Sequence, residues 1–258
     1  MLPTRFILAL FSVVFFYLLH GCSAAHSKVE EKEVSIGIEV QNETFLAYEI
    51  NPKEAEIAFY WQNDRGENYR NFLRLKEDLN NKNRELVFAV NGGMFNPLFA
   101  PQGLYIEGGE LMAPLDTFDN RTGNFYLLPN GVFSLSNTGA PAIEETSAFQ
   151  ANDSIAFATQ SGPLLLINGD YHPAFMKGST NINIRNGVGI LPNGHLFFVM
   201  SKVAVNFYDF TTFFYEKGCK NALYLDGYVS RTYLPQAGYD ELNGDFGVMI
   251  GITVPSFN

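Results

Sequence analysis

Two apolar segments of the sequence each end on a polar residue followed by glycine. Residues 85–90 run into Asn91-Gly92-Gly93, and residues 222–225 run into Asp226-Gly227. A glycine after a strand allows a sharp turn or a close approach of the backbone to a ligand. Burying an unpaired carboxylate is costly, so Asp226 is expected to be solvated, paired or used in chemistry. If the two strands are neighbours, Asn91 and Asp226 share one rim; otherwise Asn-Gly and Asp-Gly are common turn pairs.

Two further segments place polar groups between apolar strands. Ser161-Gly162-Pro163 separates two apolar runs and puts a hydroxyl and backbone amides at a bend, or forms a plain turn. Arg185 follows an alternating segment in a chain that is acidic overall. An arginine in apolar surroundings is expected to have an anionic partner, which would be a structural carboxylate or a ligand phosphate.

Other common catalytic and metal-binding signatures are missing from the sequence. It contains no phosphate-binding Gly-Lys-Ser/Thr loop, no His-Glu-x-x-His and no Cys-x-x-Cys. His172 and His195 are the histidines beyond residue 26, too few to predict a zinc site. No cofactor is expected, and a divalent metal stays an open alternative. Residues 116–124 either hold calcium loosely or form an ordinary polar loop.

A serine esterase is a second open alternative. Ser161 could act as its nucleophile with His172 or His195, but the motif Gly-x-Ser-x-Gly does not occur in the chain.

Strand-like alternation and hairpin signals dominate the chain after residue 34. Pro-Asn-Gly stands at two predicted hairpin bends, residues 129–131 and 192–194. Helical spacing occurs over residues 68–79, and a second helix is predicted after an N-cap at Asn206. These patterns predict the α+β class: a single domain with a long mixed or antiparallel sheet, hairpins and a few packed helices.

The N-terminal segment is typical of an export signal. Arg5 precedes an apolar run over residues 6–19, shorter than the roughly 20 residues of a membrane-spanning helix. Leu-His-Gly-Cys, ending at Cys22, resembles the bacterial lipobox, in which the cysteine is lipidated; ordinary cleavage after Ala25 is the alternative.

The predicted organisation is a signal over residues 1–22, a tether over 23–33 and a domain over 34–258. An exported protein is expected, held to a bacterial membrane through its lipid and facing the periplasm or the cell surface. The formal net charge of −10 argues against nucleic acid and against a bare anionic membrane as partners. An anionic substrate would need a locally basic binding site on this acidic protein.

Taken in order, the motifs NGGMF, SGPLLLING, RNGVGI and ALYLDGYVS resemble the phosphodiester glycosidase domain family, in its bacterial branch formerly described as a domain of unknown function. The similarity covers about residues 86 to 250. It implies a pocket lined by the motif positions Asn91, Gly92, Gly93, Ser161, Gly162, Arg185, Asp226, Gly227 and Ser230. The sequence departs from the family's glycine-rich run at Tyr228, Val229 and Arg231, which is expected to reshape that pocket.

The resemblance implies hydrolysis of a sugar-1-phosphodiester in an envelope or extracellular glycan. A phosphate leaving group needs little protonation, so one carboxylate and an anion-binding group suffice where glycosidases commonly use two carboxylates. Asp226 would activate water or stabilise positive charge at the anomeric carbon. Arg185, with amides near Gly92-Gly93 and Ser161-Gly162, would bind the departing phosphate.

The remaining roles follow from the same resemblance. Asn91 and Ser230 would orient sugar hydroxyls or phosphate oxygens, and Glu107 is a reserve second carboxylate. The alternative is a non-catalytic envelope lipoprotein that binds glycan or glycan-phosphate through the same pocket. The sugar, the stereochemical outcome and the oligomeric state are not predicted.

Overall fold

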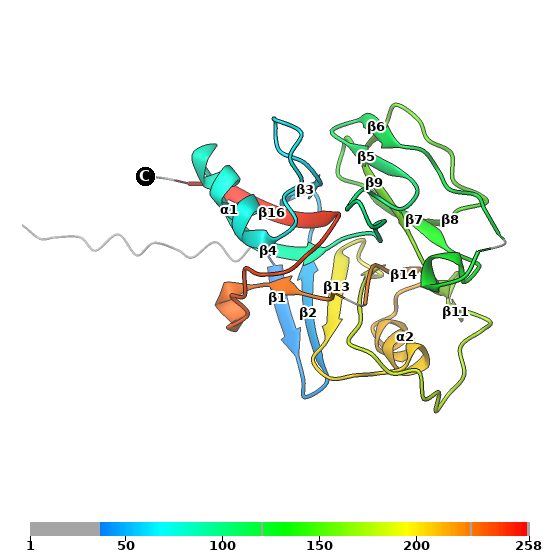
Figure 1. Cartoon of the computed structure of the whole chain (residues 1–258). Coiled ribbons are helices and arrows are strands. Elements are labelled where there is room, and N and C mark those ends of the chain that lie inside the picture. The colour runs from blue at the N-terminus through cyan, green and yellow to red at the C-terminus, as the bar shows by residue number, and fades with distance from the viewer. Residues whose placement is uncertain (1–36, 120, 228, 257–258) are drawn as a thin grey trace, which may run out of the picture. The chain divides into compact units, whose positions relative to one another are not determined.

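The structure is a computed structural model that describes residues 37–119, 121–227 and 229–256 (Figure 1). These residues belong to one compact unit. The predicted signal, the lipidation site Cys22 and the tether lie outside the described residues, as does Tyr228, so the division into signal, tether and domain stays a prediction. No helix within the described ranges is long and apolar enough to span a membrane.

The strands form three sheets in which the paired neighbours run antiparallel. The seven-stranded sheet contains, in spatial order, β1 (Gly37–Gln41), β2 (Phe45–Ile50), β13 (Leu196–Ser201), β12 (Asn186–Ile190), β14 (Ala222–Tyr224), β10 (Leu164–Ile167) and β11 (Asp170–Tyr171). The four-stranded sheet contains β15 (Thr232–Tyr233), β4 (Arg84–Asn91), β16 (Met249–Pro255) and β3 (Glu56–Tyr60). The five-stranded sheet contains β6 (Glu110–Ala113), β5 (Tyr105–Glu107), β9 (Ile155–Ser161), β7 (Gly131–Ser136) and β8 (Pro141–Glu145).

Two α-helices cover sheet faces: α1 (Phe72–Asn81) packs on β4, and α2 (Phe207–Glu216) packs near β10 and β14 (Figure 1). The predicted N-cap of α2 is confirmed, because Asn206 Oδ1 accepts a hydrogen bond from Asp209 N (2.8 Å). The first helix begins later than its spacing predicts, since Asn71 caps it and Asn68 forms a β-bridge with Gln62. Two 3₁₀ turns, η1 (Asn124–Tyr126) and η2 (Pro235–Ala237), complete the elements.

Three aromatic side chains, one from each sheet, meet in the central core. Phe198 of β13 lies 5.3 Å from Phe88 of β4 and 6.3 Å from Phe133 of β7, measured between ring centroids. All three are essentially fully buried, and each such burial contributes about 1.5–3 kcal/mol to folding. This packing joins the three sheets. The α+β class is therefore confirmed, with the seven-stranded sheet as the longest of three.

Candidate functional site

Polar residues from two sheets meet where β4 ends, β12 begins and β14 has just ended. Asn91 Nδ2 donates to the Asp226 carbonyl (3.0 Å), and Asp226 N donates to Asn186 Oδ1 (2.8 Å). Asn186 Nδ2 donates to both the side-chain and the main-chain oxygen of Asn91 (2.9 Å each). The structure thus brings Asn91 and Asp226 together, although their strands belong to different sheets. We call Asn91, Asn186, Asp226 and Ser230 the polar junction.

Ser230 closes the turn that carries Asp226. Its hydroxyl is buried and donates to the carbonyls of Asp226 (2.8 Å) and Gly227 (3.3 Å). The next residue is tied down as well, because Arg231 N donates to Asn91 Oδ1 (2.9 Å). The main chain around Asp226 is therefore fixed from three directions, and the Asp226 side chain is half-buried at the end of this turn.

Ser161 supports the same turn from the five-stranded sheet. Its hydroxyl is fully buried and donates to the Leu225 carbonyl (2.5 Å). Neither histidine that could activate it is a hydrogen-bond partner in the described part of the chain: His172 Nδ1 accepts from Ala174 N (3.2 Å), and His195 Nδ1 lies 2.8 Å from Glu49 Oε1. The geometry of a serine esterase is not assembled here.

The motif glycines allow close packing. Gly92 N donates to the Val248 carbonyl (2.7 Å), so this amide is part of the sheet rather than a ligand-binding donor. A Cβ on Gly93 would lie 2.1 Å from Thr159 Oγ1, and one on Gly162 would lie 2.7 Å from Asn130 Cβ. At Gly227 a Cβ would lie 1.6 Å from the Tyr224 hydroxyl oxygen. Side chains at these positions would force the supporting strands apart.

Arg185 is 0% exposed. Its Nε donates to the Val205 carbonyl (2.8 Å), its Nη2 donates to the Asn181 carbonyl (2.9 Å), and the guanidinium lies 3.5 Å from the Phe207 ring centroid. No ion pair among the described residues includes Arg185. Of the two partners expected for Arg185, a structural carboxylate is not the one found in this part of the chain, because carbonyl oxygens and aromatic faces solvate the cation.

Burial lowers the pKa of Arg185, while the nearby Tyr224 hydroxyl favours its charged form. Nη1 lacks a hydrogen bond of good geometry. Direct binding of a phosphate needs an exposed nitrogen, and this arrangement gives Arg185 none. Its place is behind the Asp226 turn, since the Tyr224 side chain packs between Arg185 and Gly227.

The structure does not bring Glu107 to the polar junction. Ile106 pairs with Ala158 on β9, so Glu107 lies about four residues, roughly 13 Å, along that strand from Ser161. Its Oε2 accepts a hydrogen bond from the Tyr105 hydroxyl (2.6 Å), and burial raises the pKa of the Glu107 carboxyl.

Metal ligands are not gathered at the junction. No group of three or more His, Cys, Asp or Glu side chains in residues 37–119, 121–227 and 229–256 could hold a metal ion. In the polar loop after residue 115, the Asp116 carboxylate accepts hydrogen bonds from Phe118 N (3.0 Å) and the Tyr126 hydroxyl (2.7 Å).

The sequence profile of the phosphodiester glycosidase family matches residues 84–250, which include β4, β9, β12 and β14. This chain belongs to the phosphodiester glycosidase family. The resemblance of the four motifs is thereby confirmed. A bacterial relative, the uncharacterized protein YigE of Escherichia coli, is 35% identical over 210 residues, which is 81% of this chain and 82% of the relative.

Solved structures share the fold of this phosphodiester glycosidase family member. One is the catalytic domain of zebrafish N-acetylglucosamine-1-phosphodiester alpha-N-acetylglucosaminidase, auto-inhibited by its pro-peptide. It has a TM-score of 0.56 and 13% identity over 84% of this chain and 81% of that one. Another is a putative exported protein of Burkholderia pseudomallei, with a TM-score of 0.56 and 11% identity over 81% and 73% of the two chains.

Sequence reasoning missed two residues of this family member's site. Asn186 forms hydrogen bonds with both Asn91 and Asp226. In the sequence, the feature that could have indicated this role is its position between Arg185 and Gly187 in the motif RNGVGI. From the sequence, Arg231 was identified only as a departure from the glycine-rich run of the family, without a role in the site. In the structure its main chain is bonded to Asn91, and its side chain is 46% exposed.

Proposed function

We propose that the protein is an exported hydrolase that cleaves the glycosidic bond of a sugar-1-phosphodiester in an envelope or extracellular glycan. The observation that carries this proposal is the polar junction, which fixes the main chain of Asp226 through Asn91, Asn186 and Ser230. Membership of the phosphodiester glycosidase family supports the reaction class. The fold shared with a putative exported protein is consistent with export.

The junction suits a reaction with one essential carboxylate. Its three hydrogen bonds to Asp226 go to main-chain atoms, so they fix the turn that carries the carboxylate. Asp226 takes a proton from water as the water oxygen bonds to the anomeric carbon. The bond from that carbon to the phosphate oxygen breaks, and its electron pair leaves with the phosphate monoester. A phosphate is a good leaving group, so no second carboxylate is required.

The proposal divides the anion-binding role between two arginines. Arg231 is anchored through its main chain at Asn91, and its guanidinium is partly exposed, 3.5 Å from the exposed carboxylate of Glu241. Such exposed pairs are worth little, so a phosphate can replace this partner. Arg185 contributes to phosphate binding indirectly. It is a buried cation that positions the Tyr224 ring behind the Asp226 turn.

The test is a turnover assay on the purified protein, with sugar-1-phosphodiesters and matched nitrophenyl glycosides, with and without added divalent metal. We expect release from the phosphodiesters alone, and its loss in Asp226→Asn. Equal or greater release from the nitrophenyl glycosides would contradict the leaving-group argument. No turnover of any compound, together with thermal stabilisation by the phosphodiesters, would establish a binding protein instead.

Lipid anchoring at Cys22 is a separate part of the proposal, because Cys22 lies outside the described residues. Metabolic labelling with an alkynyl palmitate in a bacterial host checks it. We expect label on the wild-type protein and none on Cys22→Ala. Cleavage after Ala25 without label would show an ordinary export signal.

A further inference from the structure

A pocket of about 380 Å³ opens at the five-stranded sheet, outside the polar junction. Three separate segments line it: residues 116–118, 128–130 and 145–147. The first two belong to loops, and the third begins at the last residue of β8. Its size is in the range of small-molecule sites in proteins. None of these residues has a role in the proposed hydrolysis.

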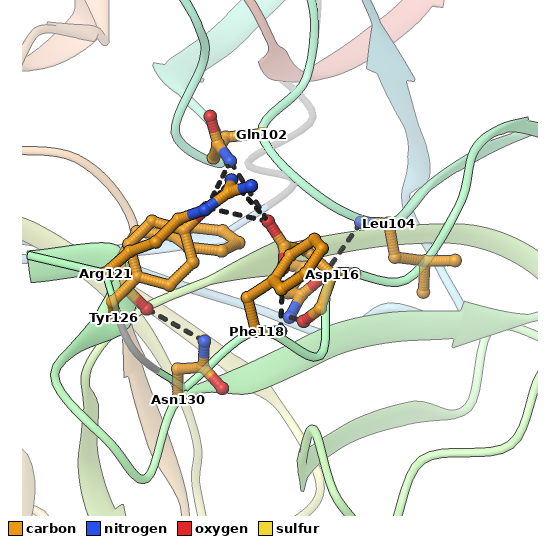
Figure 2. Close-up of polar contacts among 9 residues, drawn as sticks. Gln102, Leu104, Asp116, Phe118, Arg121, Tyr126 and Asn130 are labelled. Atoms are coloured by element: carbon orange, nitrogen blue, oxygen red, sulfur yellow. Dashed lines mark hydrogen bonds and ion pairs between the residues drawn. The ribbon is translucent and has the colours of Figure 1, made fainter.

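Asp116 organises the wall of this pocket. Its side chain is only 10% exposed. Oδ2 accepts hydrogen bonds from the Tyr126 hydroxyl (2.7 Å) and Gln102 Nε2 (3.2 Å), and Oδ1 accepts from Phe118 N (3.0 Å), as Figure 2 shows. Because one carboxylate bonds to its own loop and to two other segments, the positions of Phe118 and Tyr126 are fixed relative to each other.

Phe118 is an exposed aromatic ring held in place by a cation. The side chain is 57% exposed, and the guanidinium carbon of Arg121 lies 4.3 Å from the ring centroid. Arg121 Nη1 also donates to the Tyr126 hydroxyl (2.9 Å), which ties the stacked pair to the Asp116 network (Figure 2). These contacts hold the Phe118 ring, and a fixed, exposed ring is a ready contact surface.

Hydrogen-bonding groups surround this ring and the exposed Leu128. Ser147 Oγ donates to Glu145 Oε1 (2.7 Å) at the rim. Asn130 Nδ2 donates to the Phe125 carbonyl (2.8 Å), which fixes the orientation of its amide. The pocket thus combines apolar faces with amide, hydroxyl and carboxylate groups, the pattern of sites that bind small polar ligands.

We propose that this pocket binds a neutral sugar residue. A pyranose has an apolar CH face that can pack on Phe118 and hydroxyl groups that can bond to Glu145, Ser147 and Asn130. The carboxylates of Asp116 and Glu145 outnumber the single cation Arg121, so an anionic ligand is disfavoured. A purely apolar ligand would leave the polar groups of the pocket without partners, which is costly.

The place of this sugar in a substrate rests on the proposed function. Asn130 Cβ lies against Gly162, whose neighbour Ser161 bonds to Leu225, the residue before Asp226. The pocket is therefore joined to the polar junction through one strand end. If the protein cleaves a glycan phosphodiester, the pocket holds a neutral residue of the same glycan next to the cleaved bond.

The test measures sugar binding directly by saturation-transfer NMR and titration. The probes are glucose, N-acetylglucosamine and their β-1,4-linked disaccharides, added to the full-length protein without any phosphodiester. We expect Phe118→Ala to weaken binding by about tenfold, the loss typical of one aromatic contact. Tyr215→Ala is the matched control, because Tyr215 is also an exposed aromatic ring, 51% exposed on α2.

Each outcome separates the two proposals. Sugar binding that falls in Phe118→Ala but not in Tyr215→Ala supports the pocket, even if no phosphodiester is turned over. Sugar binding that is equal in Phe118→Ala and the wild type, or absent with every probe, overturns it, even if phosphodiesters are cleaved. Glu145→Gln provides a second variant, and a Kd unchanged in both variants would also contradict the proposal.

Discussion

Asp226 and Asp116 stand in two different polar networks. The hydrogen bonds of the polar junction reach the N–H and carbonyl of Asp226, from Asn91, Asn186 and Ser230. Asp116 is also held through its main chain, by the side chain of Gln160, and its carboxylate oxygens accept three further hydrogen bonds. In the first region the protein fixes the turn that carries the acid. In the second the carboxylate also fixes the groups around it.

This difference indicates different uses. A carboxylate whose lone pairs accept several protein hydrogen bonds is a poor base, because those bonds stabilise its ionised form. It is well suited to hold other side chains at a binding surface. At Asp226 the polar junction fixes the turn that carries the acid, and such positioning favours a reactive geometry. We therefore propose chemistry at the Asp226 turn and ligand binding at the Asp116 pocket.

The strongest test of this comparison exchanges each carboxylate for its amide. Asp226→Asn is expected to lower phosphodiester turnover by about 10³-fold, within the usual range for loss of a general base. Asp116→Asn is expected to lower turnover by less than about tenfold, and to weaken binding of the neutral sugars. Steady-state kinetics and NMR titration of both variants, with circular dichroism as the folding control, check this. A larger turnover loss in Asp116→Asn would reverse the assignment.

The second prediction concerns the residue that links the two strands at the junction. Asn186→Ala removes the acceptor for Asp226 N and the donor to both oxygens of Asn91, of which Oδ1 keeps its hydrogen bond from Arg231 N. We expect unfolding to become easier by roughly 2 to 4 kcal/mol, and turnover to fall with it. Urea denaturation measures the first effect. Asn193→Ala is the control, since Asn193 makes an exposed hydrogen bond to Glu49 and should cost little.

The structure explains what the sequence could predict of this site. Asn91 and Asp226 each follow an apolar strand, and strand ends are common places for ligands. The sequence could say only that the two residues share a rim if their strands are neighbours, and the strands lie in different sheets. The N-cap of α2 is local, so Asn206 was predictable from its neighbours. The α+β class follows from short-range alternation and turn chemistry. These features depend on residues that are close in the sequence.

The features that could not be predicted depend on tertiary packing. Sequence shows that Arg185 is charged, but not that Val205, 20 residues away, supplies its acceptor, or that Phe207 covers its face. The burial of the guanidinium, which bears on the expected phosphate contact, follows from these contacts. The Asp116 pocket brings together three segments that lie between residues 116 and 147. No local pattern marks such a surface before the sheet that assembles it is known.

A third prediction tests the exposed cation of the junction. Arg231→Ala is expected to raise the KM for a phosphodiester by roughly tenfold and to leave a smaller effect on kcat, because a charge-assisted hydrogen bond to the phosphate is lost. The effect should shrink at high salt, since exposed charges are screened. Arg65→Ala, an exposed arginine paired with Glu67, is the control. An unchanged KM in Arg231→Ala would remove Arg231 from the site.

The smallest expected effect concerns Glu107, a carboxyl that belongs to neither region. Burial raises its pKa above the ordinary value of 4.5, so the folded protein binds its proton more tightly than the unfolded chain does. Stability from this group is therefore fully present below pH 4.5 and is lost as the pH rises through the folded-state pKa. Glutamine keeps an acceptor for the Tyr105 hydroxyl and carries no charge.

Glu107→Gln should consequently raise the melting temperature slightly at pH 7 and leave it nearly unchanged at pH 4. Melting curves of the variant and the wild type across this range check the sign. Glu110→Gln, at an exposed position on the neighbouring strand β6, serves as the control and should show no such pH dependence. A variant that is less stable at pH 7 would mean that the Glu107 charge is favourable in the folded state. Loss of phosphodiester turnover in Glu107→Gln with the fold intact would place this carboxyl in catalysis, and would show that the Asp226 turn does not act with one carboxylate alone.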